Sequence, residues 1–151
     1  MSNFGIEFTG ELDREDPLVA IGLITLGDFS EYFSSTLDFW DQDDYRKSWD
    51  AGLRRLLRGA TVSCLATSVT DPPITNWVVV WPLYLSGDDV YVQNRWLFLD
   101  QLPHDFDPSA PWESVGPRTT VEDGYEVSEW RVSLNDIREF LGQKSPDARQ
   151  S

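Results

Sequence analysis

The stretch that decides the fold is Ile74-Thr-Asn-Trp-Val-Val-Val-Trp-Pro-Leu-Tyr-Leu85, followed at once by Ser86-Gly-Asp-Asp89 and Val90-Tyr-Val-Gln93. Valine, tryptophan and tyrosine favour strands, whereas glycine and aspartate form the tight turns between paired strands. The pattern therefore predicts a β-hairpin that joins a long strand to a shorter one. Because Pro82 has no backbone N–H, we expect the long strand to bend there, to carry a bulge or to lie at an edge.

Two helices are predicted, one before the hairpin and one near the C-terminus. The first covers residues 41–59, with Asp41 as its N-cap, Asp44 in its first turn and Gly59 just beyond its end. Its apolar face consists of Tyr45, Trp49, Leu53, Leu56 and Leu57. The second helix is expected to start after Ser133, with Asp136 at its third position, and to end at Gly142. Its apolar face consists of Ile137, Phe140 and Leu141.

The remaining segments complete an α+β prediction. Residues 18–33 are expected to be extended with a turn or a bulge at Gly27-Asp28, residues 61–69 to form a strand, and Asp71-Pro72-Pro73 to form a loop. A second hairpin is predicted around Glu122-Asp123-Gly124. This order predicts a mainly antiparallel sheet with a helix after the first strand and a C-terminal helix. We expect a flexible acidic arm over 1–17, a single domain over 18–142 and a polar tail over 143–151.

Composition excludes several classes of function. The chain has 151 residues, which suits one domain, and a formal net charge of −14. Such a charge opposes binding to nucleic acid and to anionic membranes, and it attracts basic proteins. The single cysteine, Cys64, cannot form an internal disulfide and is compatible with a reducing cytoplasm. No signal peptide and no apolar run of roughly 20 residues is present, so we expect a cytoplasmic protein without a membrane segment.

The chain is poor in residues that carry chemistry. With one histidine, His104, and one cysteine, an ordinary zinc site is excluded. The paired carboxylates Asp43-Asp44, Asp88-Asp89 and Glu122-Asp123 fall at predicted caps and turns, where aspartate has a backbone role. No phosphate loop, dinucleotide fingerprint or serine-nucleophile motif occurs. We therefore expect no enzyme, no metal and no cofactor, and a carboxylate hydrolase is the least favoured alternative.

Acidic residues are unevenly spread: residues 1–50 carry twelve acids against three bases, and a second acid-rich region begins with residues 103–117, which hold four prolines and are predicted to form a long irregular connection. Between Pro103 and Glu129 there are seven acids and a single arginine. A long loop and a hairpin that both carry acids favour a surface for a basic partner. Aromatic residues at element edges, Trp96 and Trp112, are candidate anchors. The predicted partner-binding residues are Asp105, Asp107, Trp112, Glu113, Glu122, Asp123, Glu126 and Glu129.

Several short segments, taken in order and spacing, resemble one protein family. They lie between roughly Leu37 and Leu141 and include Phe39-Trp40-Asp41, Ser48-Trp49, Thr75-Asn76-Trp77, Val90-Tyr-Val-Gln-Asn94, Arg118-Thr119-Thr120, Asp123-Gly124 and Ser128-Glu129-Trp130. These segments resemble the immunity proteins of contact-dependent growth inhibition (CDI) systems. The resemblance is closest to the branch whose partner toxins cleave ribosomal RNA.

The resemblance implies a small cytoplasmic protein that binds and neutralises the C-terminal nuclease domain of a large surface protein. It also implies a sheet-and-helix fold similar to Whirly domains, without their binding of single-stranded DNA. Interface residues do not carry over, because immunity surfaces vary with the toxin. The alternative from the residues alone is a general acidic interaction domain without a toxin partner.

Overall fold

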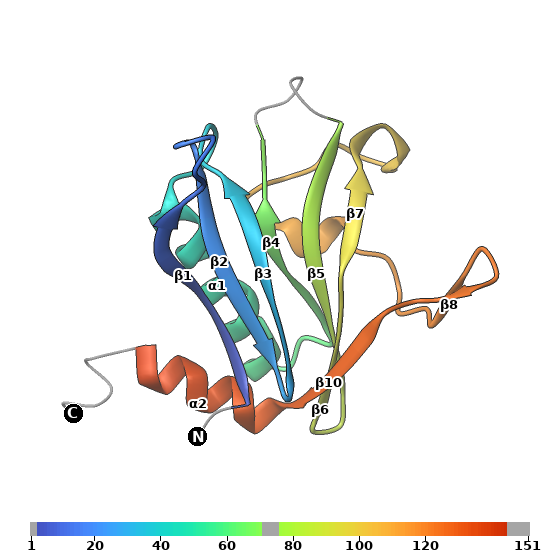
Figure 1. Cartoon of the computed structure of the whole chain (residues 1–151). Coiled ribbons are helices and arrows are strands. Elements are labelled where there is room, and N and C mark those ends of the chain that lie inside the picture. The colour runs from blue at the N-terminus through green and yellow to red at the C-terminus, as the bar shows by residue number, and fades with distance from the viewer. Residues whose placement is uncertain (1–2, 71–75, 145–151) are drawn as a thin grey trace.

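Two antiparallel sheets and two α-helices form the bulk of the protein, as the computed structural model shows for residues 3–70 and 76–144 (Figure 1). The first sheet has the order β1 (Phe4–Leu12), β2 (Val19–Leu26) and β3 (Phe29–Thr36). The second has the order β10 (Glu129–Ser133), β6 (Asp89–Gln93), β5 (Trp77–Ser86) and β4 (Val62–Ser68), with β7 (Arg95–Phe98) also paired to β5. The helices are α1 (Gln42–Leu57) and α2 (Leu134–Lys144). The predicted α+β class with mainly antiparallel sheet is confirmed.

Smaller elements connect β7 to β10 within the second sheet. The 3₁₀ turn η1 (Leu99–Gln101) precedes the long proline-rich connection, and a second one, η2 (Pro111–Ser114), lies within it. A two-stranded hairpin, β8 (Val121–Glu122) and β9 (Tyr125–Glu126), follows it. The predicted turn at Gly27-Asp28 joins two full strands, so three strands precede α1.

Both helices begin as the sequence indicates. In α1 the Asp44 backbone N–H donates to the Asp41 carboxylate over 2.8 Å, and the Asp41 N–H donates to the Asp44 carboxylate over 3.0 Å. Ser133 and Asp136 exchange the same pair of bonds at the start of α2, each 3.0 Å long. The end predicted at Gly142 is wrong: α2 continues to Lys144, because Gly142 does not adopt the left-handed conformation that ends a helix.

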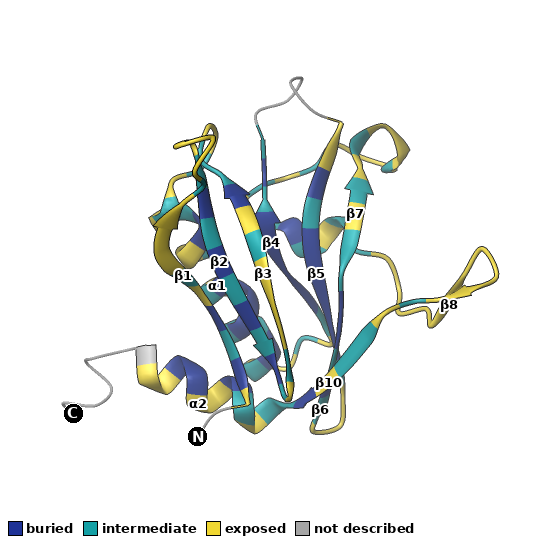
Figure 2. Cartoon of the chain, in the orientation of Figure 1, coloured by how far each residue is buried: buried dark blue, intermediate teal, exposed yellow. Residues whose placement is uncertain are grey.

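The core lies between α1 and the two sheets, where the buried face of α1 meets the strands (Figure 2). Trp49 is fully buried among Phe8, Phe33 and Tyr45, and its ring centroid lies 5.0 Å from that of Phe8. The Tyr45 hydroxyl donates to the Thr36 carbonyl over 2.7 Å and accepts from the Val69 N–H over 3.0 Å. It thereby ties α1 to the ends of β3 and β4.

Glycine in the middle of α1 has a packing reason. A Cβ at Gly52 would stand 2.6 Å from the carbonyl oxygen of Cys64 on β4, which no ordinary contact tolerates. Ser63 donates its hydroxyl to the Gly52 carbonyl over 2.6 Å at the same crossing. Although glycine weakens an isolated helix, here it allows helix and strand to touch. The neighbouring thiol of Cys64 is buried, and burial raises its pKa, which keeps it protonated and unreactive.

Two expectations about the chain ends are corrected by the structure. The flexible arm predicted over residues 1–17 is wrong for residues 4–12, which form β1 and pair with β2 from Phe4↔Leu26 onward. Phe4 and Ile6 are buried, and Phe4 packs edge-on against Phe140 of α2 at 5.4 Å. Residues 143–144 of the predicted tail belong to α2, whereas 145–151 and the loop predicted at Asp71-Pro72-Pro73 lie outside the described residues.

Strand β5 organises the second sheet. The predicted hairpin is confirmed: Ser86 pairs with Asp89 across a two-residue turn in which Gly87 has φ 61°. One edge of β5 pairs with β4, while the other is shared, with β6 along Leu83–Ser86 and β7 along Trp77–Val80. Pro82, which has no N–H to donate, lies between the residues paired with β6 and those paired with β7, and β5 continues through it as an inner strand.

Candidate partner-binding surface

One element projects clear of the body of the molecule: the β8–β9 hairpin (Figure 1). Its turn residues Asp123 and Gly124 have φ values of 52° and 81°, the left-handed pair that a type I′ hairpin turn requires. The predicted turn is therefore confirmed. All residues from Val121 to Glu126 are exposed, and Tyr125 is 78% exposed.

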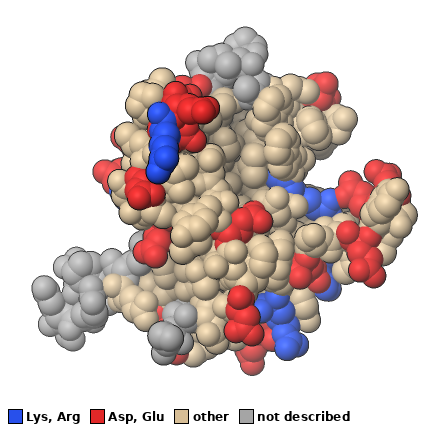
Figure 3. Space-filling view, in the orientation of Figure 1, with Lys and Arg blue, Asp and Glu red and all other residues tan. Residues whose placement is uncertain are grey.

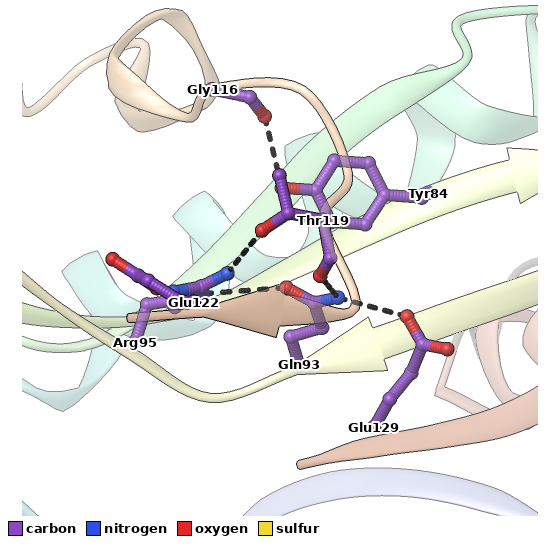
Figure 4. Close-up of polar contacts among 7 residues, drawn as sticks. All are labelled: Tyr84, Gln93, Arg95, Gly116, Thr119, Glu122 and Glu129. Atoms are coloured by element: carbon purple, nitrogen blue, oxygen red, sulfur yellow. Dashed lines mark hydrogen bonds and ion pairs between the residues drawn. The ribbon is translucent and has the colours of Figure 1, made fainter. Parts of the chain in front are cut away.

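A buried glutamine holds the base of the hairpin to the second sheet (Figure 4). Gln93 of β6 is fully buried, and its Nε2 donates to the Thr119 carbonyl over 2.9 Å and to the Glu129 carboxylate over 2.8 Å. Its Oε1 accepts from Arg95 Nε over 3.3 Å. Arg95 in turn donates to the Thr119 hydroxyl over 3.1 Å and forms an ion pair with Glu122. The amide of Gln93 therefore holds Thr119 directly, and it also orients Arg95, which contacts Thr119 and Glu122.

A second set of contacts fixes the segment just before the hairpin. The guanidinium of Arg118 donates twice to the Glu129 carboxylate, over 2.8 and 2.6 Å, and lies 4.0 Å from the ring centroid of Tyr91. The Tyr84 hydroxyl donates to the Gly116 carbonyl over 2.9 Å. The hydrogen bonds from Arg118 lower the pKa of Glu129 below its ordinary value, and burial opposes this shift. Glu129 is thus engaged inside the protein.

Neutralising Glu129 is expected to destabilise the protein in a pH-dependent way. Because the folded-state pKa lies below the unfolded one near 4.5, the carboxylate contributes stability that is fully present above pH 4.5 and lost as the pH falls through the folded value. The unfolding free energies of the wild type and Glu129→Gln should therefore differ most at neutral pH and converge in acid. Urea unfolding at a series of pH values measures this. A difference that stays constant into acid would contradict the role given to this ion pair.

The eight residues predicted to bind a partner do not form one surface. Glu122, Asp123 and Glu126 are exposed on the hairpin, whereas Glu129 lies at its base, bonded to Arg118. The other four, Asp105, Asp107, Trp112 and Glu113, belong to the connection that crosses near α1.

Two residues in the connection have structural partners of their own. The Asp107 carboxylate accepts from the backbone N–H and hydroxyl of Ser109, over 2.9 and 2.6 Å, and these bonds lower its pKa. Trp112 is half-buried beneath the guanidinium of Arg55, 4.6 Å from its ring centroid. Asp105 and Glu113 are exposed. Of the two candidate aromatic anchors, it is Trp96 that is 57% exposed.

An acidic hollow of about 610 Å³ lies between the hairpin and the body of the protein. Phe29 and Trp130 form its aromatic wall, with ring centroids 4.4 Å apart, and Trp81 packs against Trp130. The charged residues that line the hollow are Glu31, Arg95, Glu122, Asp123 and Glu126. Figure 3 shows acidic side chains on the projecting hairpin and scattered across this face of the molecule. Carboxylates around aromatic side chains suit a basic partner that also offers apolar contacts.

The polar residues that build this surface were not among the predicted site residues. Gln93, Arg118 and Thr119 stand in the segments that resemble the CDI family, yet nothing local in the sequence pairs them. A glutamine in an otherwise apolar strand is the available signal, since a buried amide requires partners. Its partners Thr119 and Glu129 are 26 and 36 residues away in sequence.

The described residues hold neither a metal-binding cluster nor a membrane-spanning helix. Residues 3–70 and 76–144 contain no group of three or more histidine, cysteine or acidic side chains placed to hold a metal ion. Within the same ranges, no helix is long and apolar enough to cross a membrane.

Comparison with known proteins identifies the family of the chain. The family model described as the CdiI N-terminal domain matches residues 35–140. The immunity protein CdiI of Enterobacter cloacae subsp. cloacae is 37% identical over 139 residues, which are 91% of this chain and 95% of that protein. A chain of the CdiA-CT/CdiI toxin and immunity complex from Enterobacter cloacae superposes with a TM-score of 0.83 at 35% identity, over 98% of this chain and 99% of the other. The chain therefore belongs to the CdiI family of immunity proteins.

Proposed function

We propose that this chain binds the C-terminal toxin domain of a CdiA-type surface protein in the cytoplasm and neutralises it by binding, without catalysis. The observation that carries the proposal is the likeness, over 98% of the chain, to a chain of a toxin and immunity complex. The alternative of a general acidic interaction domain has no comparable support, because the family match and the relative both belong to immunity proteins.

The charge of the chain favours a nuclease as the toxin. A domain that grips RNA needs basic side chains on its binding surface, and a chain of net charge −14 attracts such a surface at long range. Within this proposal the exposed hairpin acids Asp123 and Glu126 take the place of RNA phosphates, while Glu122 forms an ion pair with Arg95 within the protein. Asp105, Trp112 and Glu113 form a second candidate contact region beside α1. Asp107 and Glu129 contribute mainly by holding the loop and the hairpin in place.

Co-expression with the toxin domain encoded beside this gene tests the proposal. The two proteins should purify as one complex, and the toxin should cleave ribosomal RNA when alone but not in the complex. A toxin that forms no complex, or that remains active within one, would overturn the proposal. A toxin that is inhibited but cleaves no RNA when alone would overturn only the nuclease assignment.

A pair of double variants with equal net charge tests the hairpin acids. Asp123→Asn with Glu126→Gln removes two exposed hairpin charges, and asparagine tolerates the left-handed turn position. Glu11→Gln with Glu15→Gln removes two exposed charges near the first sheet. At low salt the hairpin double variant should associate with the toxin about tenfold more slowly than the wild type does. The control double variant should associate at close to the wild-type rate. Equal rates for both pairs would show that only overall charge matters.

A further inference from the structure

Strand β7 leaves one edge of the second sheet open. It pairs with β5 from Trp77↔Phe98 to Val80↔Arg95, and no other described strand pairs with it. In Figure 1, β7 forms the side of the sheet that faces the projecting hairpin. An open edge matters because its unpaired backbone groups are a template for another strand.

The backbone groups on this open edge belong to Trp96 and Phe98. Leu99 donates its N–H to the Asn76 carbonyl over 2.7 Å, which makes that pair a hydrogen-bonded one in the antiparallel ladder. Hydrogen-bonded pairs alternate along the ladder, so Leu97 and Arg95 also face β5. The N–H groups of Trp96 and Phe98 therefore face away from β5. Among the described residues, none accepts a hydrogen bond from either N–H.

The last three residues of this edge carry neither charge nor proline. Edges are commonly blunted by lysine, proline or inward-pointing charge, but residues 96–98 read Trp-Leu-Phe. Trp96 is 57% and Phe98 41% exposed, and both lie on the same face of the β5–β7 ribbon. Trp96 stacks on the 39% exposed Trp77 with ring centroids 5.7 Å apart. Three exposed aromatic side chains beside an open edge provide apolar contact area for an added strand.

A groove runs between β7 and the segment that leads to the hairpin. It has a volume of about 400 Å³ and is lined by Trp96, Leu97 and Phe98 on one side and by Gly116, Thr119 and Val121 on the other. Figure 3 shows a notch in this region between the body and the hairpin. The groove includes Glu122, and the exposed Asp100 follows β7 directly. Its one lining arginine, Arg95, is paired with Glu122.

The negative charge of the chain indicates which kind of partner can dock on the edge of β7. A second copy of the chain would bring two molecules of net charge −14 together, each with the exposed Asp100 directly after β7. The same negative charge that repels a second copy attracts a basic partner. The geometry points to β7 as a docking edge: we propose that an extended segment of the basic toxin domain adds to β7 as a further strand, bonding to the N–H groups of Trp96 and Phe98. This inference rests on the proposed function, and it adds the surface and the mode of binding.

Residue-specific amide hydrogen exchange tests the added strand. In the free protein the amides of Trp96 and Phe98 should exchange fast, and those of Arg95 and Leu97 slowly, because the latter pair with β5. In the complex with the toxin domain, exchange at Trp96 and Phe98 should slow by at least tenfold. A complex in which both amides exchange at the free rate would overturn the inference and leave the proposed function intact. Failure to form any complex would overturn both.

The free protein must also be examined for self-association. If sedimentation shows a dimer and the amides of Trp96 and Phe98 are already protected before toxin is added, the occupant is a second copy and the proposal is overturned. A monomer with unprotected amides supports it.

A matched pair of variants at Phe98 distinguishes the contribution of the backbone N–H to toxin binding from that of the aromatic ring. Phe98 has φ −87° and ψ 119°, close to the φ that proline requires, and its N–H is not used by β5. Phe98→Ala and Phe98→Pro both remove the ring, but only the second removes the outward N–H. With equal unfolding midpoints, Phe98→Pro should bind the toxin domain about tenfold more weakly than Phe98→Ala, as expected for one lost hydrogen bond. Equal affinities would overturn the added strand.

Discussion

Replacing Trp49 by alanine is expected to lower the free energy of unfolding by about 3–5 kcal/mol, the range for deleting a large aromatic side chain from a packed core. Trp49 is fully buried, and its Nε1 donates to the Ala66 carbonyl over 2.7 Å. Its ring packs against Phe8 of β1 and Phe33 of β3. The substitution would open a cavity where α1, the first sheet and β4 meet. Thermal unfolding followed by circular dichroism should show a midpoint lower by about 10 °C.

Two further variants identify the source of that loss. Trp49→Phe keeps most of the aromatic packing but leaves the Ala66 carbonyl without its donor, so its loss should be intermediate. Trp96→Ala makes the same deletion at a side chain that is 57% exposed and should cost less than about 1 kcal/mol. If Trp49→Ala cost no more than Trp96→Ala, the aromatic cluster around α1 would not be the centre of the core.

The sequence predicts the elements whose signals are local. The start of α1 depends on Asp41 and Asp44, which are three residues apart, and the hairpin tip depends on Asp123 and its neighbour Gly124. Because each of these signals requires only near neighbours, a single sequence suffices to find them. By contrast, β1 was predicted as an arm because the acids of residues 11–16 dominate that region. Its alternation of Phe4, Ile6 and Phe8 was nevertheless a strand signal.

The candidate site was less accessible to prediction, because it depends on contacts between distant segments. An acid-rich stretch shows where carboxylates are numerous but not which of them already have partners. Glu129 and Asp107 were predicted as contact residues, yet both form hydrogen bonds within the protein. The open edge of β7 was also beyond prediction, because it depends on β10 pairing with β6 as far as Gln93 and not with β7. Likeness of the fold to Whirly domains stays a prediction.

Replacing Gln93 by leucine is expected to lower the free energy of unfolding by about 3 kcal/mol and to weaken toxin binding as well. Leucine fits the strand but offers no donor, so the Thr119 carbonyl and one oxygen of the Glu129 carboxylate each lose a hydrogen bond. Gln93 is fully buried and cannot touch a partner itself. Any loss of affinity must therefore arise through the segment of residues 119–122 that Gln93 holds in place. Urea unfolding and titration with the toxin domain measure the two effects.

The same change at Gln143, an exposed residue of α2, is the matched control and should leave both stability and affinity close to wild type. Amide exchange distinguishes a loosened hairpin from general destabilisation. In Gln93→Leu the amides of residues 119–127 should exchange faster at urea concentrations where those of α1 do not. If the variant lost stability but bound the toxin with unchanged affinity, the hairpin would be dispensable for binding, and the contact surface would have to lie elsewhere, on the Asp105–Glu113 side or along β7. Experiments on Gln93 can therefore separate stability from recognition. A hairpin that is held in place contributes to binding only if its acids contact the toxin.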